Sequence, residues 1–305
     1  MAYAFPQRVS QFVQITNISS PASVSGGNLV VNFPNGYTYH KVYVNLGNTT
    51  SSAYINSNTY LQINGLLIQQ YLSFTDYQEE LSYYGLYDAV SGTQILVFYL
   101  DRPKLLSTEL QELTAIYTGK RQVINGVDTG PEVNNMILNI GFTADPALVI
   151  GNITVFADVS NDINPPQLWS RKQVTLNIGG AIGQVNSNEI QKNELIDKFI
   201  FTAASTVLTR VQLYLDNVIT WDRTFDMNAL IQRSGTIARV PDITYAFVIE
   251  PGENGDGRQT ISPFKVDGSS VSSFYAVLYT ASAVPSINLI VRTFTTLPNS
   301  GTGAA

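Results

Sequence analysis

The sequence predicts an all-β protein of two tandem eight-stranded jelly rolls, a double jelly roll, with a few short helices. Most segments are short apolar or alternating runs separated by Gly, Pro, Asn and Asp, a pattern typical of antiparallel strands. Long helices that could cross between parallel strands are few, so a parallel sheet is disfavoured. About eight strands in each ~150 residues fit two Greek keys closed into a jelly roll.

A repeat within the chain supports the two-unit architecture, because a duplicated pattern constrains the whole fold. Residues 60–85 and 212–235 share one order: a strand, a tight turn, a strand, a Phe, a short helical stretch and a Gly. The turn is Asn64-Gly65 in the first copy and Asp216-Asn217 in the second. The two copies are offset by roughly 150 residues, near half of the chain length.

Strands and helices are predicted from periodicity and from capping residues. The clearest strand segments are residues 28–33, 37–46, 94–100, 136–142, 198–202, 211–215, 244–249 and 287–294. One helix is predicted after Thr108, where Thr108 and Gln111 match a capping box. A second is predicted from Asp226, a candidate cap, to Gly235 at its end.

The predicted domains are an N-terminal arm at residues 1–27, a first jelly roll at 28–145, a connector at 146–193 and a second jelly roll at 194–305. Pro165-Pro166 would stiffen the connector, because proline restricts φ. The arm carries an apolar strip that we expect to contact a neighbouring subunit or a membrane. That strip consists of Phe5, Pro6, Phe12, Val13 and Ile15.

Composition excludes several classes of function. The chain carries 17 Lys and Arg against 23 Asp and Glu without a basic cluster, so no direct nucleic-acid binding is expected. It has no Cys and one His, so no metal site, disulfide or thiol nucleophile is expected, and no cofactor is predicted. Its first residues lack the pattern of a signal peptide, and no apolar window reaches the ~20 residues of a membrane span.

The residues capable of acid-base chemistry have simpler structural interpretations. His40 lies on an alternating strand, and no nucleophile elbow accompanies it in the sequence. Glu79 and Glu80 on a helix point about 100° apart, so at most one of them faces a given site. No catalytic residue is therefore predicted.

Two alternatives to a structural protein remain. In a carbohydrate-binding or adhesin-like double β-sandwich, Tyr83, Tyr84 or Trp221 would be exposed stacking platforms. In a jelly-roll glycosidase, carboxylates such as Asp222 and Asp226 would face one cleft. The simpler interpretation makes Asp226 a helix cap and Trp221 a core residue.

Two glycine-rich loops lack the spacing of known ligand sites. Residues 250–257 offer carboxylate oxygens for Ca²⁺ but do not match the calcium-loop pattern, so an acidic hairpin loop is expected. Residues 179–183 lack the pattern of a phosphate-binding loop, so nucleotide binding is not expected.

Four short segments resemble the double jelly-roll major capsid proteins of tailless icosahedral phages with an internal membrane, of the corticovirus and finnlakevirus types. These segments are FPNGYTY at residues 33–39, FYLDRP at 98–103, LWSRK at 168–172 and the strand, turn and Trp at 211–221. The resemblance spans residues 28–297. Loops 120–131 and 252–257 depart from the family pattern, so contacts between capsomers are not carried over.

This resemblance implies a viral major capsid protein that is part of the virion and has no enzymatic activity. It implies a homotrimeric, pseudo-hexagonal capsomer that builds an icosahedral shell around an internal membrane with other capsid proteins. It also implies synthesis in the host cytoplasm. Two similar units in each of three chains would give such a tile nearly six equivalent edges.

Overall fold

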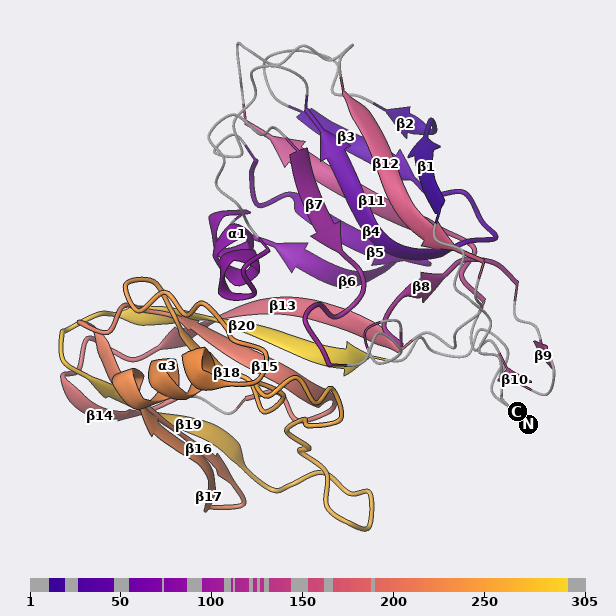
Figure 1. The fold of residues 1–305 in the computed structure, drawn as a ribbon. Helices are drawn as coiled ribbons and strands as arrows, with labels where there is room; N and C mark the ends of the chain where they lie inside the picture. Colours follow the sequence, from indigo (N-terminus) through magenta and orange to yellow (C-terminus); the bar gives the residue numbers. More distant parts are fainter. Residues whose placement is uncertain are drawn as a thin grey trace.

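The computed structural model describes most of the chain. The described residues are 11–19, 27–46, 55–72, 74–86, 95–106, 111, 113–120, 123–124, 127–128, 132–143, 153–161, 167–187 and 190–295. They form two β-rich lobes that lie one above the other in Figure 1, with the N-terminal half above.

The described part of the first jelly roll contains two facing antiparallel sheets and a ten-residue helix. One sheet has the order β1 (Gln11–Ile15), β12 (Thr154–Ser160), β4 (Thr38–Asn45) and β7 (Ile95–Tyr99), and β8 (Ile116–Tyr117) also pairs with β4. The other has the order β2 (Ile18–Ser19), β3 (Gly27–Asn32), β11 (Met136–Phe142), β5 (Thr59–Ile63) and β6 (Leu66–Tyr71). Helix α1 (Phe74–Tyr83) follows β6, and β9 (Val123–Ile124) pairs with β10 (Val127–Asp128).

The second jelly roll repeats this plan. One sheet has the order β13 (Leu168–Asn177), β20 (Ser286–Thr295), β15 (Leu195–Thr202) and β18 (Phe247–Ile249). The other has the order β14 (Gly183–Asn186), β19 (Phe274–Thr280), β16 (Leu208–Leu215) and β17 (Val218–Thr224). Helix α3 (Phe225–Ser234) follows β17. The predicted double jelly roll is therefore confirmed.

The predicted duplication is visible strand by strand. The order β1-β12-β4-β7 corresponds to β13-β20-β15-β18, and β3-β11-β5-β6 corresponds to β14-β19-β16-β17. The two predicted hairpin turns have equivalent backbones, because Asn64 (φ 50°) and Gly65 (φ 81°) match Asp216 (φ 47°) and Asn217 (φ 65°). Positive φ at both central residues is the conformation that Asn, Asp and Gly tolerate in a two-residue hairpin.

The turn side chains also make equivalent contacts in the two rolls. Asn64 Oδ1 accepts hydrogen bonds from the backbone nitrogens of Asn134 (3.0 Å) and Asn135 (3.2 Å). Asp216 Oδ1 accepts them from the backbone nitrogens of Ser272 (2.5 Å) and Ser273 (3.0 Å). Each turn therefore holds the segment that leads into the neighbouring strand, β11 or β19.

Each roll closes over a core of its own because alternate residues of its two sheets point inward. Val42 and Val44 of β4 and Val155 of β12 are fully buried in the first core. Phe199 and Phe201 of β15 are buried in the second core. The polar residues between them line the opposite face of each sheet, and some of these meet the other roll.

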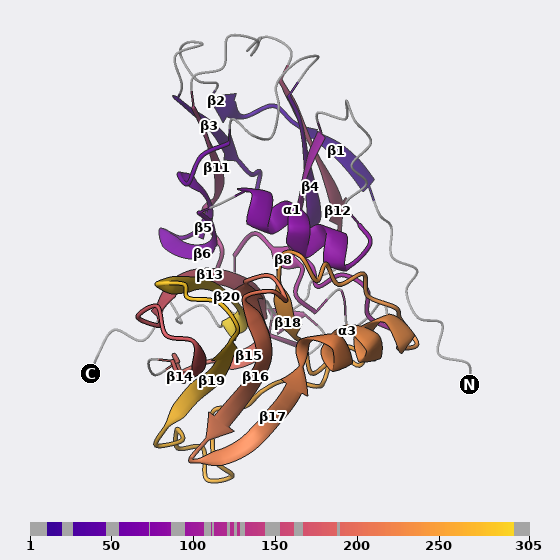
Figure 2. The same ribbon diagram turned by 90° about the vertical axis from the view of Figure 1, so that its left-hand side faces the viewer.

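The two rolls share one continuous sheet. Strand β6 of the first roll pairs in parallel with β13 of the second at Gln69 and Arg171, which joins four strands of the second roll and five of the first into one nine-stranded sheet. The side view in Figure 2 shows α1 lying between the lobes, above the sheet that contains β13 and β20. Among the described residues, no helix combines the length and the apolar character that crossing a membrane requires.

The predicted arm and connector differ from the observed pairing. Within the predicted arm, Phe5 and Pro6 lie outside the described residues, whereas residues 11–15 form β1, which pairs with β12 of the same chain. Ile15 lies in the first core and Val13 packs against it. The sequence analysis missed β1 because it is short and carries two Gln among its five residues. Topologically, β1 is the first strand of the first roll, equivalent to β13.

The predicted connector at 146–193 contains two long strands. Strand β12 lies inside a sheet of the first roll, and β13 lies inside the nine-stranded sheet. The Pro165-Pro166 pair lies outside the described residues.

The two predicted helices have different outcomes. The second forms α3, but its N-cap is Thr224, whose side chain accepts from Met227 N, and Asp226 lies in the first turn instead. The first falls mostly on residues that are not described; Gln111 is helical, and residues 113–115 form turns and a bend.

Candidate functional site: a buried ionic junction between the rolls

Charged side chains gather where α1 of the first roll meets the sheet β13-β20-β15-β18 of the second. Glu80 of α1 is 2% exposed and accepts from three cations of the second roll. Arg292 Nε lies 2.7 Å from Glu80 Oε1, Arg171 Nε lies 3.2 Å from Oε2, and Lys198 Nζ lies 3.4 Å from Oε1. One carboxylate of the first roll is thus held by three strands of the second.

The pKa values of Glu80 and Lys198 depend on the presence of their charged partners. Burial by itself raises the pKa of Glu80, but the charges of Arg292, Lys198 and Arg171 outweigh burial and lower that pKa well below its usual range. Burial also lowers the pKa of Lys198, although Glu80 opposes the shift. Each charge is therefore stable in the interior only while its partners are present.

A second carboxylate, Glu250, is buried beside the first. The guanidinium of Arg239 binds it with two hydrogen bonds, from Nε to Oε2 at 2.9 Å and from Nη2 to Oε1 at 3.1 Å. From the first roll, the hydroxyls of Tyr83 (2.9 Å) and Tyr84 (3.3 Å) donate to the same carboxylate. Burial raises the pKa of Glu250, and the charges of Arg239 and Lys198 lower it to a net value below the usual range.

Another ion pair also joins the two rolls, and in this pair the cation belongs to the first roll and the carboxylate to the second. Arg102, which follows β7 of the first roll, pairs with Asp197 of β15, and its Nη1 donates to the carbonyl of Gly257 at 2.7 Å. Asp197 also accepts from the indole Nε1 of Trp169 at 2.8 Å. The Trp169 ring lies 3.9 Å from the Arg292 guanidinium, so the aromatic face contributes to stabilising this buried cation.

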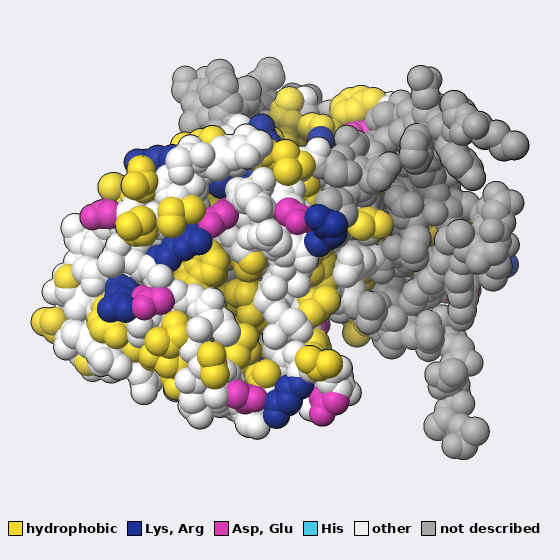
Figure 3. Space-filling view, turned by 60° about the horizontal axis from the view of Figure 1, so that its bottom comes forward, with side chains coloured by type: hydrophobic (Ala, Val, Ile, Leu, Met, Phe, Trp, Pro, Cys, Tyr) yellow, Lys and Arg dark blue, Asp and Glu magenta, His cyan; other side chains and the backbone are white. Residues whose placement is uncertain are grey.

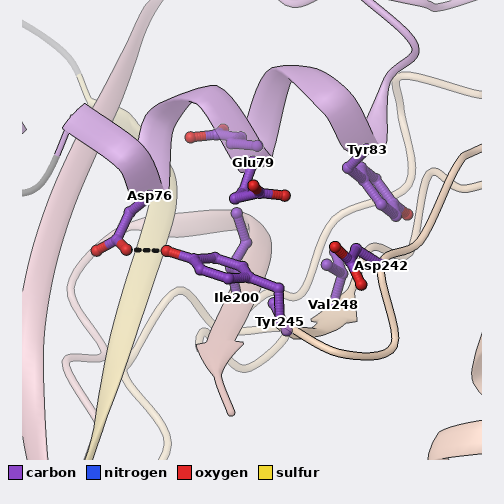
Figure 4. Close-up of a pocket in the computed structure, with 9 residues that line it drawn as sticks. Asp76, Glu79, Tyr83, Ile200, Asp242, Tyr245 and Val248 are labelled. Atoms are coloured by element: carbon purple, nitrogen blue, oxygen red, sulfur yellow. Dashed lines mark hydrogen bonds between the residues drawn. The ribbon is translucent and has the colours of Figure 1, made fainter. Parts of the chain in front are cut away.

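The edge of the junction is drawn in Figure 4. Asp76 of α1 accepts a hydrogen bond from the hydroxyl of Tyr245, which follows α3 in the second roll. Gln173 of β13 donates to the other oxygen of Asp76 at 3.2 Å. Glu79 lies beside this contact, and Ile200 lies beneath the helix. Only a shallow pocket opens here, at the rim of the buried group.

This arrangement is suited to holding two rolls in one orientation. Removing one member of a buried ion pair leaves an uncompensated charge, so small rotations of one roll against the other are energetically costly. The carboxylates Glu80 and Glu250 and the cations that pair with them are buried in the interior. The junction therefore acts as a joint in a rigid two-roll unit.

The structure separates Glu79 from Glu80, as the helical spacing predicts. Glu80 is buried in the junction and Glu79 lies at its rim. The proposed stacking platforms are wrong for two residues, because Tyr83 and Tyr84 are 3% and 2% exposed. The second roll covers both rings, which no local pattern could indicate.

The residues considered for a sugar site do not form one cleft. Trp221 is half-buried on β17 against the second core, and the Arg223 guanidinium lies 3.9 Å from its ring. Asp222 binds Arg210 on the surface, from Arg210 Nε to Oδ1 at 2.7 Å. Asp226 lies on the exposed side of α3.

His40 has neighbours that the sequence analysis did not foresee. Its Nε2 lies 3.0 Å from Ser160 Oγ, and its Nδ1 lies 3.8 Å from Asp101 Oδ2. These are the residue types of a hydrolase triad, but all three side chains are buried, with His40 and Ser160 each 1% exposed. A substrate carbonyl cannot reach Ser160 without displacing the core.

Both glycine-rich loops that were considered as ligand sites contain residues with a structural role. Glu250, the first residue of the acidic loop, points inward to Arg239. Residues 179–180 form a turn with positive φ at both glycines. No group of three or more potential metal ligands occurs within the described ranges.

Sequence reasoning missed the cations of the junction. The signal was present, since charged residues make up only 13% of the chain, yet several fall inside otherwise apolar strands. A buried strand that carries a cation indicates a paired carboxylate elsewhere. The cations concerned are Arg102, Arg171, Lys198, Arg239 and Arg292.

Comparison with known proteins agrees with this geometry. Residues 15–160 match the family model described as the viral coat protein P2 N-terminal domain. The major capsid protein P2 from bacteriophage PM2 superposes with a TM-score of 0.75 at 15% identity, over 96% of this chain and 100% of that chain. No curated protein sequence matches significantly.

Two further solved capsid proteins have the same fold. The STIV MCP superposes with a TM-score of 0.63 at 11% identity, over 97% of this chain and 99% of that chain. The PBCV-1 virus capsid protein superposes with a TM-score of 0.57 at 11% identity, over 96% of this chain and 95% of that chain.

Two rolls joined rigidly side by side define a double jelly roll, the fold that this chain shares with these capsid proteins. Residues 15–160 resemble the viral coat protein P2 N-terminal domain, and the whole chain has the fold of the major capsid proteins compared above. The predicted resemblance to this group of phage capsid proteins is confirmed, and the adhesin-like alternative is not supported.

Proposed function

We propose that three copies of this chain form a pseudo-hexagonal capsomer, and that these capsomers tile an icosahedral shell. The single observation that carries this proposal is the equivalence of the two rolls, strand for strand, in one chain. Each roll has a core of its own, and the buried junction that fixes the two rolls in one orientation exists only because of the duplication. Its advantage lies in how the paired rolls meet other copies.

The surface chemistry supports repeated packing of identical copies. Figure 3 shows hydrophobic side chains spread over the underside of the second roll, separated by single pairs of opposite charge. On β16 and β17 of this roll, Arg210 forms an ion pair with Asp222. With a net charge of −6 on 305 residues, copies brought side by side repel one another only weakly.

We further infer a purely structural role. The one His of the chain is enclosed together with Ser160, and the carboxylates of the junction are neutralised by cations. In this proposal the neighbours of a capsomer are other capsomers and other capsid proteins, with an internal viral membrane beneath, and nucleic acid is not bound directly. The chain is then synthesised in the host cytoplasm before assembly.

The test is the oligomeric state of the purified protein. Light scattering at micromolar concentration should give the mass of three chains, and negative-stain images should show hexagonal outlines. The interfaces should exceed the ~1,200 Å² lower range for stable contacts and persist on dilution. A stable monomer would overturn the proposal.

A further inference from the structure

Helices α1 and α3 occupy equivalent places on their own rolls. Both have ten residues and begin with a buried Phe within three residues of the end of the equivalent strands β6 and β17. Tyr77, the fourth residue of α1, donates to the carbonyl of Val97 on β7 at 3.1 Å. Asn228, the fourth residue of α3, donates to the carbonyl of Val248 on β18 at 2.6 Å. The two helices can therefore be compared position by position.

The face of α1 that enters the junction is free on α3. The third and seventh residues of α1, Asp76 and Glu80, are buried against the second roll. Their equivalents on α3 are Met227, which is 52% exposed, and the half-buried Ile231. The sixth position is Leu230 on α3 and is 62% exposed. An acidic, buried face on α1 thus corresponds to an apolar, exposed face on α3.

The sheet faces correspond as well, and matching β-bulges set their register. A bulge skips His40 where β4 pairs with β12, and another skips Asp197 where β15 pairs with β20. The residue after each bulge is a lysine, Lys41 or Lys198. The same registers make Phe12 of β1 the equivalent of Arg171 of β13.

Two strand pairs complete the correspondence. Tyr43 of β4 lies opposite Phe156 of β12, and the equivalent pair in the second roll is Ile200 of β15 opposite Ile290 of β20. Ile200 lies beneath α1 inside the junction. Tyr43 therefore marks the place on the first roll where a second helix would lie.

On the outer face of β1-β12-β4-β7, Phe12, Asp158 and Lys41 occupy the places of Arg171, Arg292 and Lys198, and the rings of Tyr43 and Phe156 lie beside Phe12. The Phe12 ring stacks on Phe156, with centroids 5.1 Å apart and an interplanar angle of 9°, and meets the edge of Tyr43 at 5.4 Å. Phe12 is nevertheless 64% exposed. An exposed cluster of three aromatic rings on an antiparallel sheet indicates an interaction surface.

We propose that α3 of one copy packs on the outer face of β1-β12-β4-β7 of the next copy, as α1 packs on β13-β20-β15-β18 within the chain. This inference rests on the proposed homotrimer and names its contact. Met227, Leu230 and Ile231 lie against the aromatic cluster of Phe12, Tyr43 and Phe156. The partner is a second copy of this chain, because only the first roll carries that sheet face.

The sheet edges extend the same relationship. Within the chain, edge strand β6 meets β13 at Gln69 and Arg171. The equivalent strands, β17 and β1, are both edge strands of their sheets. Trp221 is the equivalent of Gln69, since both follow the same hairpin bulge, and its enclosed Nε1 has no acceptor among the described residues. Strand β17 of one copy therefore approaches β1 of the next, with Trp221 near Phe12.

Such a contact is head-to-tail and closes into a ring. One rotation relates the first roll to the second inside a chain, and a similar rotation relates the second roll to the first roll of the next chain. Repetition of this step gives a closed set of alternating rolls, three chains in the proposed capsomer. In Figure 2, α3 and the β1-β12-β4 sheet lie toward the same side of the molecule.

The difference in chemistry determines which roll meets which. An acidic α1 docked on the outer face of β1-β12-β4-β7 would bury Glu80 against Phe12 and Asp158 in place of Arg171 and Arg292, which is costly. An apolar α3 docked on the cationic face would leave Arg171, Lys198 and Arg292 without a carboxylate. Each mismatch is penalised, so the two junctions cannot exchange partners.

The first experiment places a charge in the proposed contact. Leu230→Glu should lower the trimer association constant at least about tenfold, because an unpaired carboxylate would be buried among aromatic rings. Val266→Glu, at a fully exposed residue of the loop between β18 and β19, is the matched control and should leave the trimer intact. Circular dichroism and thermal melting verify that both monomers fold.

The second variant tests the register. Ile231→Glu alone should dissociate the trimer, and combining it with Phe12→Arg should restore assembly, because the pair reproduces Glu80 and Arg171. The chain has no Cys, so Leu230→Cys with Tyr43→Cys gives two unique thiols. A short bis-maleimide should join them into covalently closed trimers.

The outcomes separate this contact from the capsomer itself. A wild-type trimer that tolerates Leu230→Glu and gives no cross-linked trimers would overturn the proposed contact while the proposed function stands. A wild-type monomer would overturn the proposed function.

Discussion

Glu80 and Arg292 lie 212 residues apart in the chain, yet Arg292 Nε donates to Glu80 Oε1 at 2.7 Å in the interior. Glu80 belongs to the helix of the first roll, and Arg292 lies on the last strand of the second. The junction can therefore form only after both rolls are complete. The pair joins α1 of the first roll to β20 of the second and so helps to fix the orientation of the two rolls.

Breaking this pair should be costly. Glu80→Gln leaves Arg171, Lys198 and Arg292 buried without their carboxylate, and we expect it to lower the free energy of unfolding by about 3–5 kcal/mol. Glu79→Gln, at the rim of the same helix, is the control and should change stability by less than about 1 kcal/mol. Urea denaturation of both variants measures the difference. Equal effects would contradict the assigned role of Glu80.

Acid should weaken the junction. The net pKa of Glu80 and of Glu250 is lowered in the folded chain, where the neighbouring cations outweigh burial. A carboxylate with a lowered folded pKa contributes stability above its unfolded pKa of about 4.3, and that contribution is lost as the pH falls toward the folded pKa. Unfolding free energies measured from about pH 7 to about pH 3 should fall more steeply for the wild type than for Glu80→Gln. Parallel curves would show that Glu80 is not the group responsible.

Deleting residues 2–16 should destabilise the first roll. The deletion removes β1 and takes Ile15 out of the first core, where burying such a side chain contributes about 1.5–3 kcal/mol. Deleting residues 2–10 leaves β1 in place and is the control. Thermal melting should show a lower midpoint for the longer deletion. If both deletions melt like the wild type, β1 is not a structural strand of this roll.

His40 should be dispensable for chemistry. His40→Gln and Ser160→Ala each disturb a buried hydrogen bond and should cost about 1–3 kcal/mol of stability. Particle assembly should persist in both variants at moderate temperature, as seen by electron microscopy. A hydrolytic activity of the wild type that vanishes in either variant would reverse the structural interpretation.

The sequence by itself determined the units of this fold. Hairpin turns at Asn64-Gly65 and Asp216-Asn217 need residues that tolerate positive φ, and this need is local, so the dipeptides predict the turns. Alternating strands such as β4 follow from a period of two, and the repeated order of elements revealed two rolls. The sequence did not predict strand β1, because the strand has only five residues and two of them are Gln.

Tertiary structure alone decided how the rolls meet. Sequence patterns report which face of a strand is apolar, but they do not report which distant element covers that face. Tyr83 and Tyr84 are buried because the second roll lies over them, and Glu80 is matched with cations 91 to 212 residues away. Electrostatic pairing in the interior depends on three-dimensional proximity, so the same Glu in sequence could equally have been a solvated surface residue.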